Sequence, residues 1–300
     1  MSIEVKNVTK LYGEQKALDE ISFSVEPGNI VGFLGPNGAG KSTMMKIITC
    51  FIPQTSGSVS VCGYDVIDNP IDVKRQVGYL PEHNPLYLDM YVKEYLDFVG
   101  GVYKIGKRKE RVKEMIDMVG LGIEQNKKIG ALSKGYRQRV GLAQAMIHDP
   151  KVLILDEPTT GLDPNQLEEI RNLIKNIGKE KTIMLSTHIM QEVEAICDKT
   201  IIINRGTIVA NDKTEKLQAQ QKDQIVLTVE FDKQADAKAL QKIEGVIQVK
   251  NSIHNTWLFE IANDAVRNNI FQYAMQKEMV VLTMQKETQS LESVFKRLTS

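Results

Sequence analysis

The sequence predicts an α/β protein built on a parallel sheet, with a smaller α+β domain after it. Three short apolar runs support the first prediction: residues 30–34, 152–155 and 182–185. Such runs are typical of strands buried on both faces of a sheet, and an amphipathic helical pattern separates the last two. Strands that alternate with helices indicate a parallel sheet covered by helices. The 300 residues are enough for two domains, since a domain contains roughly 100 to 200 residues.

Two further strands are expected ahead of the first apolar run. Apolar and polar residues alternate from Ile3 to Thr9, which indicates an edge strand, and again from Ile21 to Val25 before a Glu-Pro-Gly turn. From residue 86 to 145 the pattern is mostly helical, with no clear buried strand. The mixed-charge run 107–111 in that region is expected to be a solvated helix face rather than a nucleic-acid site.

Residues 225–300 show the pattern of a second domain. Polar residues dominate from 212 to 224, which predicts a helix end and a linker. Beyond the linker, strand and helix patterns follow in the order β-α-β-β-α-β, a ferredoxin-like arrangement. The expected strands cover residues 225–231, 246–249, 257–261 and 279–284, and the expected helices lie near Leu240 and Ile270. A short amphipathic helix is expected at the C-terminus, with one apolar face formed by Leu291, Val294, Phe295 and Leu298.

Composition and charge exclude several classes of protein. Apolar residues make up 42% of the chain and charged residues 25%, which excludes a disordered or fibrous protein. The 38 basic residues balance the 38 acidic ones, so net charge provides no general attraction to nucleic acid. No run of about 18 apolar residues and no apolar leader occur, so we expect a cytoplasmic chain that does not span a membrane. Cys50, Cys62 and Cys197 lack metal-ligand spacing, and we expect them to be small apolar side chains rather than redox or metal-binding groups.

A glycine-rich loop joins the apolar run 30–34 to a helical stretch from Lys41 to Phe51. The loop matches the pattern G-x-x-x-x-G-K-[ST] of phosphate-binding loops, although a purely structural loop is the alternative. Glycines allow successive N–H groups to point at anionic oxygens, and the helix N-terminus adds partial positive charge. Lys41 supplies a full charge for the β- and γ-phosphates, and Ser42 a hydroxyl for Mg²⁺. The expected phosphate-binding residues are Gly35, Pro36, Asn37, Gly38, Ala39, Gly40, Lys41, Ser42 and Thr43.

Two adjacent carboxylates, Asp156 and Glu157, follow the apolar run 152–155. Ligands of open α/β sheets bind in the crevice at the carboxyl ends of the strands, where this pair is expected. We expect Asp156 to hold Mg²⁺ through water and Glu157 to face the water that attacks the γ-phosphate. The alternative is an N-cap carboxylate before Pro164, which explains one acid but not two.

The residues from Ile3 to about Leu217 resemble the ATP-binding subunit of an ABC transporter. The glycine-rich loop and the acid pair correspond to the Walker A and Walker B motifs of that family. Residues 132–136 (Leu-Ser-Lys-Gly-Tyr) resemble the signature motif, and residues 161–164 (Gly-Leu-Asp-Pro) resemble the D-loop with Asp163. Residues 186–188 (Ser-Thr-His) resemble the strand end that carries the family's switch histidine, and Tyr12 stands where the family stacks an aromatic ring on adenine.

This resemblance implies a P-loop NTPase fold, an ABC nucleotide-binding domain over residues 1–217. It implies a parallel core sheet, an antiparallel β subdomain and a helical subdomain at about 86–145. A linker at 218–224 and an accessory or regulatory domain at 225–300 complete the expected organisation.

The resemblance also implies a mechanism that needs two ATPase subunits, as a homodimer or a pair, and a membrane permease. ATP and Mg²⁺ bind one subunit, with Ser42, Asp156 and Glu82 as implied metal ligands. The other subunit covers the γ-phosphate with its signature residues, which are Ser133, Lys134, Gly135 and Tyr136. The implied catalytic residues are Glu157 and His188, although a buried structural histidine is the alternative for the latter. His83, His148 and His254 lack such a context and are expected to be structural.

Two departures from the family pattern concern charge. Lys134 and Tyr136 replace a glycine and a glutamine of the usual signature, and Glu82 replaces the glutamine of the Q-loop. Both variants occur in the exporter-type branch, and within it the chain resembles subunits associated with gliding motility. The segment with Pro85, Leu86, Tyr87, Met90 and Tyr91 resembles the region that docks the permease, although core packing is the alternative.

The sequence therefore favours an ATPase subunit that drives a separate permease, attached to the inner face of the membrane. A soluble ABC ATPase acting on nucleic acid or the ribosome is the alternative, but the chain has no coiled coil, second cassette or basic excess. A nucleotide-dependent switch with feeble turnover is a third possibility.

Overall fold

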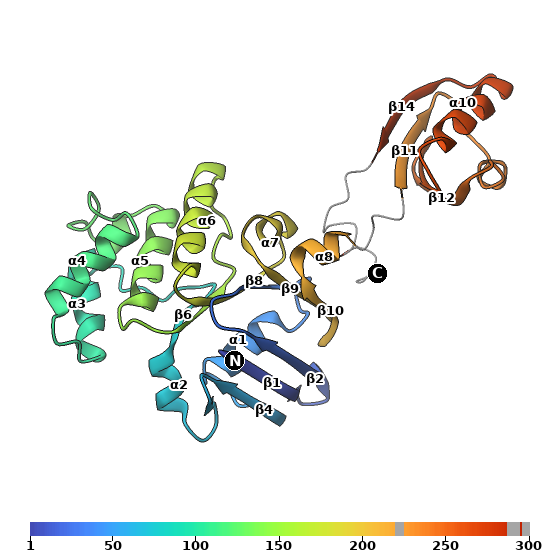
Figure 1. Cartoon of the computed structure of the whole chain (residues 1–300). Coiled ribbons are helices and arrows are strands. Elements are labelled where there is room, and N and C mark those ends of the chain that lie inside the picture. Colours follow the sequence, from blue (N-terminus) through green and yellow to red (C-terminus); the bar gives the residue numbers. More distant parts are fainter. Residues whose placement is uncertain (220–224, 287–294, 296–300) are drawn as a thin grey trace. The chain divides into compact units, whose positions relative to one another are not determined.

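The computed structural model describes residues 1–219, 225–286 and 295 (Figure 1). The chain divides into two compact units, with the boundary between Thr214 and Glu215. Each unit has its own apolar core, formed by side chains of that unit alone. No helix within the described part of the chain is long and apolar enough to cross a membrane.

The first unit contains a six-stranded sheet in the order β10-β9-β3-β8-β7-β6. Five strands are parallel, and β10 pairs with β9 in the antiparallel direction. The three predicted apolar strands are confirmed as β3, β8 and β7, which are neighbours in the sheet and buried throughout. The strand bounds are β3 Ile30–Leu34, β6 Val77–Leu80, β7 Val152–Asp156, β8 Thr182–Thr187, β9 Lys199–Asn204 and β10 Thr207–Lys213.

Strand β6 lies outside the sequence predictions, because its four residues are too few for a clear pattern. It includes Gly78, which lies against the backbone of the helical region. A Cβ added to Gly78 would be 2.1 Å from the backbone oxygen of Ala145. A glycine at this position lets helix α5 (Lys134–Met146) pack directly on the sheet.

An antiparallel sheet in the order β2-β1-β4-β5 packs against the same core. The prediction of an edge strand at Ile3 to Thr9 is wrong, because β1 hydrogen-bonds to β2 on one side and to β4 on the other. The alternation that suggested an edge reflects one buried face instead, since Ile3, Val5 and Val8 all point into the core. The bounds are β1 Ile3–Tyr12, β2 Gln15–Val25, β4 Ser56–Val61 and β5 Tyr64–Asp65.

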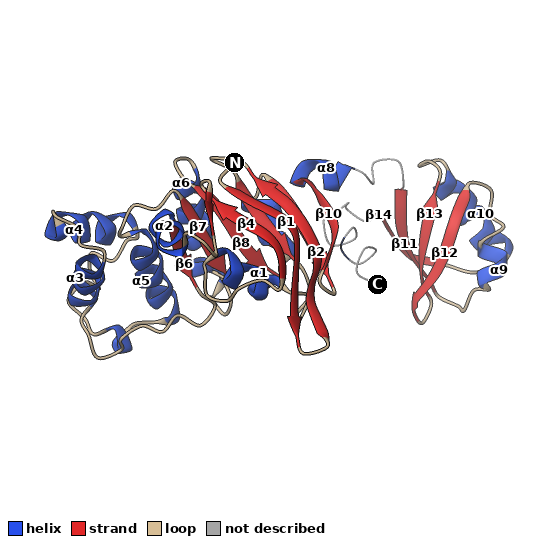
Figure 2. Ribbon diagram, turned by 90° about the horizontal axis from the view of Figure 1, so that it is seen from below, coloured by secondary structure: helices blue, strands red, loops and turns tan. Residues whose placement is uncertain are grey.

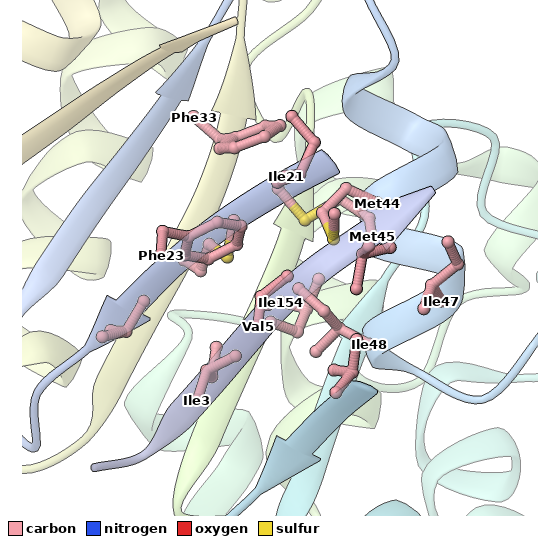
Figure 3. Close-up of a cluster of buried hydrophobic side chains, with 14 of the residues drawn as sticks. Ile3, Val5, Ile21, Phe23, Phe33, Met44, Met45, Ile47, Ile48 and Ile154 are labelled. Carbon is pink, nitrogen blue, oxygen red and sulfur yellow. The ribbon is translucent and has the colours of Figure 1, made fainter. Parts of the chain in front are cut away.

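Helix α1 (Lys41–Ile48) joins the two sheets through apolar contacts (Figure 3). Met44, Met45 and Ile48 of this helix lie among side chains of the antiparallel sheet and Ile154 of β7. On the opposite face of the core sheet lie α6 (Pro164–Gly178) and α7 (Met190–Ile196) (Figure 1). This packing fixes the N-terminus of α1 at the carboxyl ends of the parallel strands.

The region predicted to be helical contains α3 (Val92–Val102), α4 (Arg108–Met118) and α5. Arg111, the last residue of the charged run 107–111, has a structural role, because its side chain joins α4 to the end of α5. Its guanidinium donates to the backbone oxygens of Met146 and Ile147, at 2.8 and 3.0 Å. The short helices are α2 Pro70–Gln76, α8 Thr214–Ala219 and the 3₁₀ turn Ile129–Ala131.

The second unit has the predicted β-α-β-β-α-β order, with an antiparallel sheet in the order β12-β13-β11-β14 (Figure 2). The expected first helix is only one turn long. Of the stretch 212–224, expected to contain a helix end and a linker, residues 212 and 213 belong to β10, α8 ends at Ala219, and residues 220–224 lie outside the described residues. Of the C-terminal helix, Leu291, Val294 and Leu298 lie outside the described residues, whereas Phe295 is buried. The bounds are β11 Ile225–Phe231, α9 Ala237–Leu240, β12 Val246–Ile253, β13 Thr256–Ile261, α10 Val266–Gln276 and β14 Val281–Lys286.

A chain that ends at residue 224 should keep the fold of the first unit, because this unit contains a large apolar cluster built from residues between Ile3 and Ile203. We expect its affinity for a fluorescent ATP analogue to equal that of the full chain, while assembly or regulation changes. Loss of nucleotide binding in a truncated chain with an unchanged circular dichroism spectrum would contradict this separation of the units.

Candidate active site

The glycine-rich loop runs from the end of β3 to the start of α1 and needs glycine for steric reasons. Gly40 has φ +107°, and a Cβ on it would lie 2.5 Å from the Ala17 oxygen. A Cβ on Gly35 would lie equally close to the Ile203 oxygen. The loop is therefore a backbone cradle that excludes side chains, which is what close approach of N–H groups to a phosphate requires.

Lys41 is buried at the first position of α1, and its ammonium faces the loop. The Nζ atom donates to the backbone oxygens of Gly35 and Pro36, at 2.8 and 3.3 Å. It also lies 3.6 Å from Oε1 of Glu157, which is buried too. A buried ammonium costs free energy unless it is paired, so this carboxylate stabilises the charge that the cradle holds.

The acid pair lies where β7 ends, beside the end of β8. Asp156 accepts hydrogen bonds from Ser186 Oγ and, at 3.3 Å, from Ser42 Oγ. Glu157 has φ +50°, a left-handed conformation that is uncommon for a residue with a side chain. Its N–H donates to the Ser186 hydroxyl at 3.2 Å. Neither acid caps a helix, because Asp163 caps α6 by accepting from the Gln166 N–H.

His188 follows the last residue of β8 and contacts the same carboxylate. Its Nδ1 lies 3.0 Å from both carboxylate oxygens of Glu157. The imidazole is 44% exposed, so it is not the fully buried structural histidine that the sequence left open. The structure thus gathers one ammonium, two carboxylates and one imidazole at the ends of three neighbouring strands.

The oxygen donors at this edge fit Mg²⁺. This ion prefers hydroxyl and carboxylate ligands and completes its shell with phosphate oxygens and water, so it does not need a full set of protein ligands. The Ser42 Oγ and Asp156 Oδ1 atoms are 3.3 Å apart, and the described residues contain no group of three or more His, Cys, Asp or Glu side chains that could hold a metal ion by itself. Glu82 is exposed after β6, and burial together with the charges of Asp156 and Glu82 raises the pKa of Tyr79.

The signature residues lie apart from this cluster, at the N-terminus of α5. Ser133 caps the helix by accepting from the Tyr136 N–H at 3.4 Å, and the side chains of Ser133, Lys134 and Tyr136 are exposed. Gly135 is buried against Gln166 of α6, whose Oε1 would lie 2.6 Å from an added Cβ. Within the described part of the chain, no hydrogen bond or ion pair joins these residues to the glycine-rich loop.

Tyr12 lies at the exposed end of β1, with the Lys10 ammonium 5.3 Å from its ring centroid. The hairpin that carries it leads to Ala17, which contacts the glycine-rich loop. An exposed aromatic face beside the cradle can stack on a planar base.

The other histidines and the cysteines lie outside the site. His148 stacks on Tyr103, with ring centroids 4.0 Å apart, and its Nε2 contacts the Val77 oxygen. Burial lowers the pKa of His148 to about 4, so the ring is neutral near pH 7. His83 and His254 are exposed, and burial raises the pKa of each of the three thiols above its usual value, which disfavours the reactive thiolate.

The sequence predictions do not assign a role in the site to the hydroxyls of Ser186 and Thr160 or to the carboxylate of Glu192. Ser186 holds both members of the acid pair, and Thr160 Oγ1 donates to Glu157 Oε2 at 3.1 Å. Glu192 of α7 is buried behind the site. Ser186 could have been found from the sequence, because it is the polar residue that directly follows the apolar run 182–185, which is predicted to lie in the same sheet as the run before the acid pair.

Comparison with known proteins places this site in a family. The family model described as "ABC transporter" matches residues 18–160. The chain is 31% identical to the uncharacterized ABC transporter ATP-binding protein YxlF of Bacillus subtilis, over 98% of both chains. The chain belongs to the ABC transporter ATP-binding proteins. This ABC ATPase is also 32% identical to the linearmycin resistance ATP-binding protein LnrL of Bacillus subtilis, over 99% of its own length and 98% of LnrL.

The fold agrees with solved structures of the same family. The dimeric structure of the ATP-binding cassette MJ0796 in a post-hydrolysis state, bound to ADP and Pi, has a TM-score of 0.65 and 28% identity. The match covers 70% of this chain and 98% of that cassette. The P-loop ABC fold is therefore confirmed, and this ABC ATPase binds ATP and couples its hydrolysis to transport.

Replacing Lys41 by alanine should abolish detectable nucleotide binding, because the cradle loses the ammonium group that contacts the loop oxygens. Lys46 is an exposed lysine of the same helix, so Lys46→Ala is a matched control with near-normal affinity. Equilibrium titration with a fluorescent ATP analogue measures both. Unchanged affinity of a folded Lys41→Ala variant would show that the loop assignment is wrong.

Proposed function

We propose that this chain is the ATP-hydrolysing subunit of an ABC exporter and works as a pair of ATPase subunits on a separate membrane permease. The arrangement of Lys41, Glu157 and His188 carries the proposal. The glycine-rich loop and Lys41 hold the triphosphate, and Ser42, Asp156 and Glu82 face the Mg²⁺ that neutralises phosphate charge. Glu157 orients and activates the attacking water, and His188 stabilises the γ-phosphate. Tyr12 stacks on the adenine.

The second subunit supplies the missing side of each site. Ser133 and the Gly135 N–H, together with Lys134 and Tyr136, lie at the exposed N-terminus of α5, where backbone N–H groups attract anions. Asp163 of the D-loop lies on the neighbouring helix start. The dimeric state of the related cassette MJ0796 supports such a pairing. ATP bound between the two subunits would join them, and hydrolysis would let them separate.

A docking patch for the permease is proposed on the helical region. Tyr87 and Phe98 are exposed, and their rings lie 5.8 Å apart, with Tyr95 packed on the first. Leu88 and Tyr91 are exposed in the same segment, so core packing does not account for these apolar side chains. Contiguous exposed apolar surface marks interaction sites. Attachment through this patch would place the chain at the inner face of the membrane.

Export is the proposed direction, and the relative named for linearmycin resistance supports it, because its likeness extends over the second unit. Residues 225–300 are proposed to be an accessory or regulatory domain. The link to gliding motility stays a prediction, as none of the relatives described above has a name that concerns motility. The nucleic-acid alternative is not favoured, because the chain has balanced charge and transporter relatives.

Replacing Glu157 by glutamine should slow ATP hydrolysis about 100-fold or more, as expected when a general base is lost, while ATP still binds. The variant should accumulate as an ATP-bound dimer, because the step that opens the pair is blocked. Steady-state turnover and light scattering with and without ATP measure the two effects. Glu168 is exposed on α6, so Glu168→Gln is the matched control. A Glu157→Gln variant that stays monomeric in ATP would contradict the shared site.

Replacing Phe98 by aspartate should reduce recovery of the permease at least tenfold when the chain is purified from detergent extracts, because a charge then faces an apolar contact. Ile123, 88% exposed on the same helical region, provides the control Ile123→Asp, which should recover the permease normally. The nucleotide affinity of each purified variant checks its folding. Equal recovery with both variants would place the docking site elsewhere.

A further inference from the structure

Glu192 is a buried carboxylate that the proposed chemistry leaves unused. It belongs to α7, is 1% exposed, and forms no ion pair with any described residue. Its two oxygens accept hydrogen bonds from two threonine hydroxyls: Thr159 Oγ1, and Thr187 Oγ1 at 2.7 Å. Both threonines are buried as well. An unpaired buried charge is costly, and an apolar side chain of similar volume often serves stability equally well, so stability alone does not explain this acid.

The two threonines belong to the two chain segments that form the site. Thr159 lies two residues after Glu157, in a turn closed by hydrogen bonds from the Thr160 N–H to the Glu157 oxygen and from the Leu162 N–H to the Thr159 oxygen. That turn leads directly to Asp163. Thr187 is the last residue of β8 and precedes His188. The Glu192 carboxylate therefore connects the turn 157–163 to the strand end that carries the imidazole.

The geometry of Glu157 depends on such a connection. Its left-handed backbone, at φ +50°, is a conformation that a residue with a side chain keeps only when its surroundings enforce it. On one side, the Glu157 N–H is held by the oxygen and hydroxyl of Ser186. On the other side, the turn is held through Thr159 by Glu192. These two attachments hold the backbone on either side of Glu157, whose carboxylate lies 3.0 Å from Nδ1 of His188.

We propose that Glu192 is a positioning residue for ATP hydrolysis. By fixing Thr159 and Thr187 together, it keeps the Glu157 carboxylate beside the His188 imidazole and makes the turn that ends at Asp163 move with them. The inference rests on the roles proposed above for Glu157 and His188. It predicts that the connection affects turnover and leaves ATP affinity unchanged. Among the described residues, the side chains of Glu192, Thr159 and Thr187 form no hydrogen bond to the glycine-rich loop or to Lys41. The Gly35 N–H donates to the backbone oxygen of Thr187 at 3.3 Å, a bond that does not involve the threonine side chain.

The test removes each hydroxyl or one acceptor oxygen and keeps the volume of the side chain. We expect Thr159→Val and Glu192→Gln to lower kcat about tenfold, in line with losing one hydrogen bond to a charged group, with KM for ATP unchanged. Thr159→Ser keeps the hydroxyl and should restore most of the kcat lost in Thr159→Val. The double variant Thr159→Val/Thr187→Val should lose less kcat than the product of the losses in Thr159→Val and Thr187→Val, because both hydroxyls donate to the same carboxylate. Thr187→Val also removes the bond from the Ile189 N–H to the Thr187 hydroxyl, and this part of its loss should persist in the double variant.

Two results would overturn the positioning role. One is wild-type kcat in folded Thr159→Val and Glu192→Gln variants. The other is a loss shared equally by kcat, ATP affinity and the thermal unfolding midpoint, which indicates structural damage only. If Glu192→Gln does not fold, the pair Thr159→Val and Thr159→Ser decides the question alone. Full turnover of a Glu157→Gln variant would refute the proposed site itself. Wild-type turnover of Thr159→Val, together with slow turnover of Glu157→Gln, would overturn only the role of Glu192.

Discussion

The contact between the Lys41 ammonium and the Glu157 carboxylate is the constraint on which the first unit depends. The two charges are buried 3.6 Å apart, and separating them without a replacement partner would leave each one unpaired in a poorly solvated place. They come from the segments after β3 and β7, which are separated in the sheet by β8 alone. The parallel register, with Leu34 opposite Thr187 and Asp156 opposite Ser186, is what brings these strand ends to one level.

The turn from Glu157 to Asp163 is held by several elements of the first unit. Helix α5 reaches it through Gln138, whose amide donates to the Pro158 oxygen at 2.8 Å, and through Lys134, which packs against Gly161. Helix α7 reaches it through Glu192. Helix α5, helix α7 and the turn that carries Glu157 and Asp163 are thus connected to one another, so a change at Glu157 can reach the surface on which we propose that a second subunit binds.

Local sequence predicted most of the fold and the motif residues of the site. Strands β3, β7 and β8 were recognisable because burial on both faces leaves an unbroken apolar run, and the glycine-rich loop because its spacing is fixed by phosphate geometry. The strands that pair with β1 were not recognisable, because pairing partners are set by residues distant in the sequence rather than by the alternation of apolar and polar residues within the strand. Glu192 was overlooked for the same reason. A glutamate in a helix is usually exposed, and only the tertiary position of Thr159 and Thr187 makes this one an acceptor.

Because the His148 ring is half-buried in a stack on Tyr103, the stability of the helical region depends on pH in the acidic range. An unfolded histidine takes up a proton as the pH falls through about 6.5, whereas the folded ring resists protonation until about pH 4. Between these two pH values the unfolded chain binds more protons than the native chain. Acidification therefore lowers the free energy of unfolding of the region at the end of α5, and a return to neutral pH restores it. The contact of the His148 ring with the Val77 oxygen, which joins the end of this helix to the strand Val77–Leu80, is therefore the point at which a mildly acidic medium lowers the stability of the helical region.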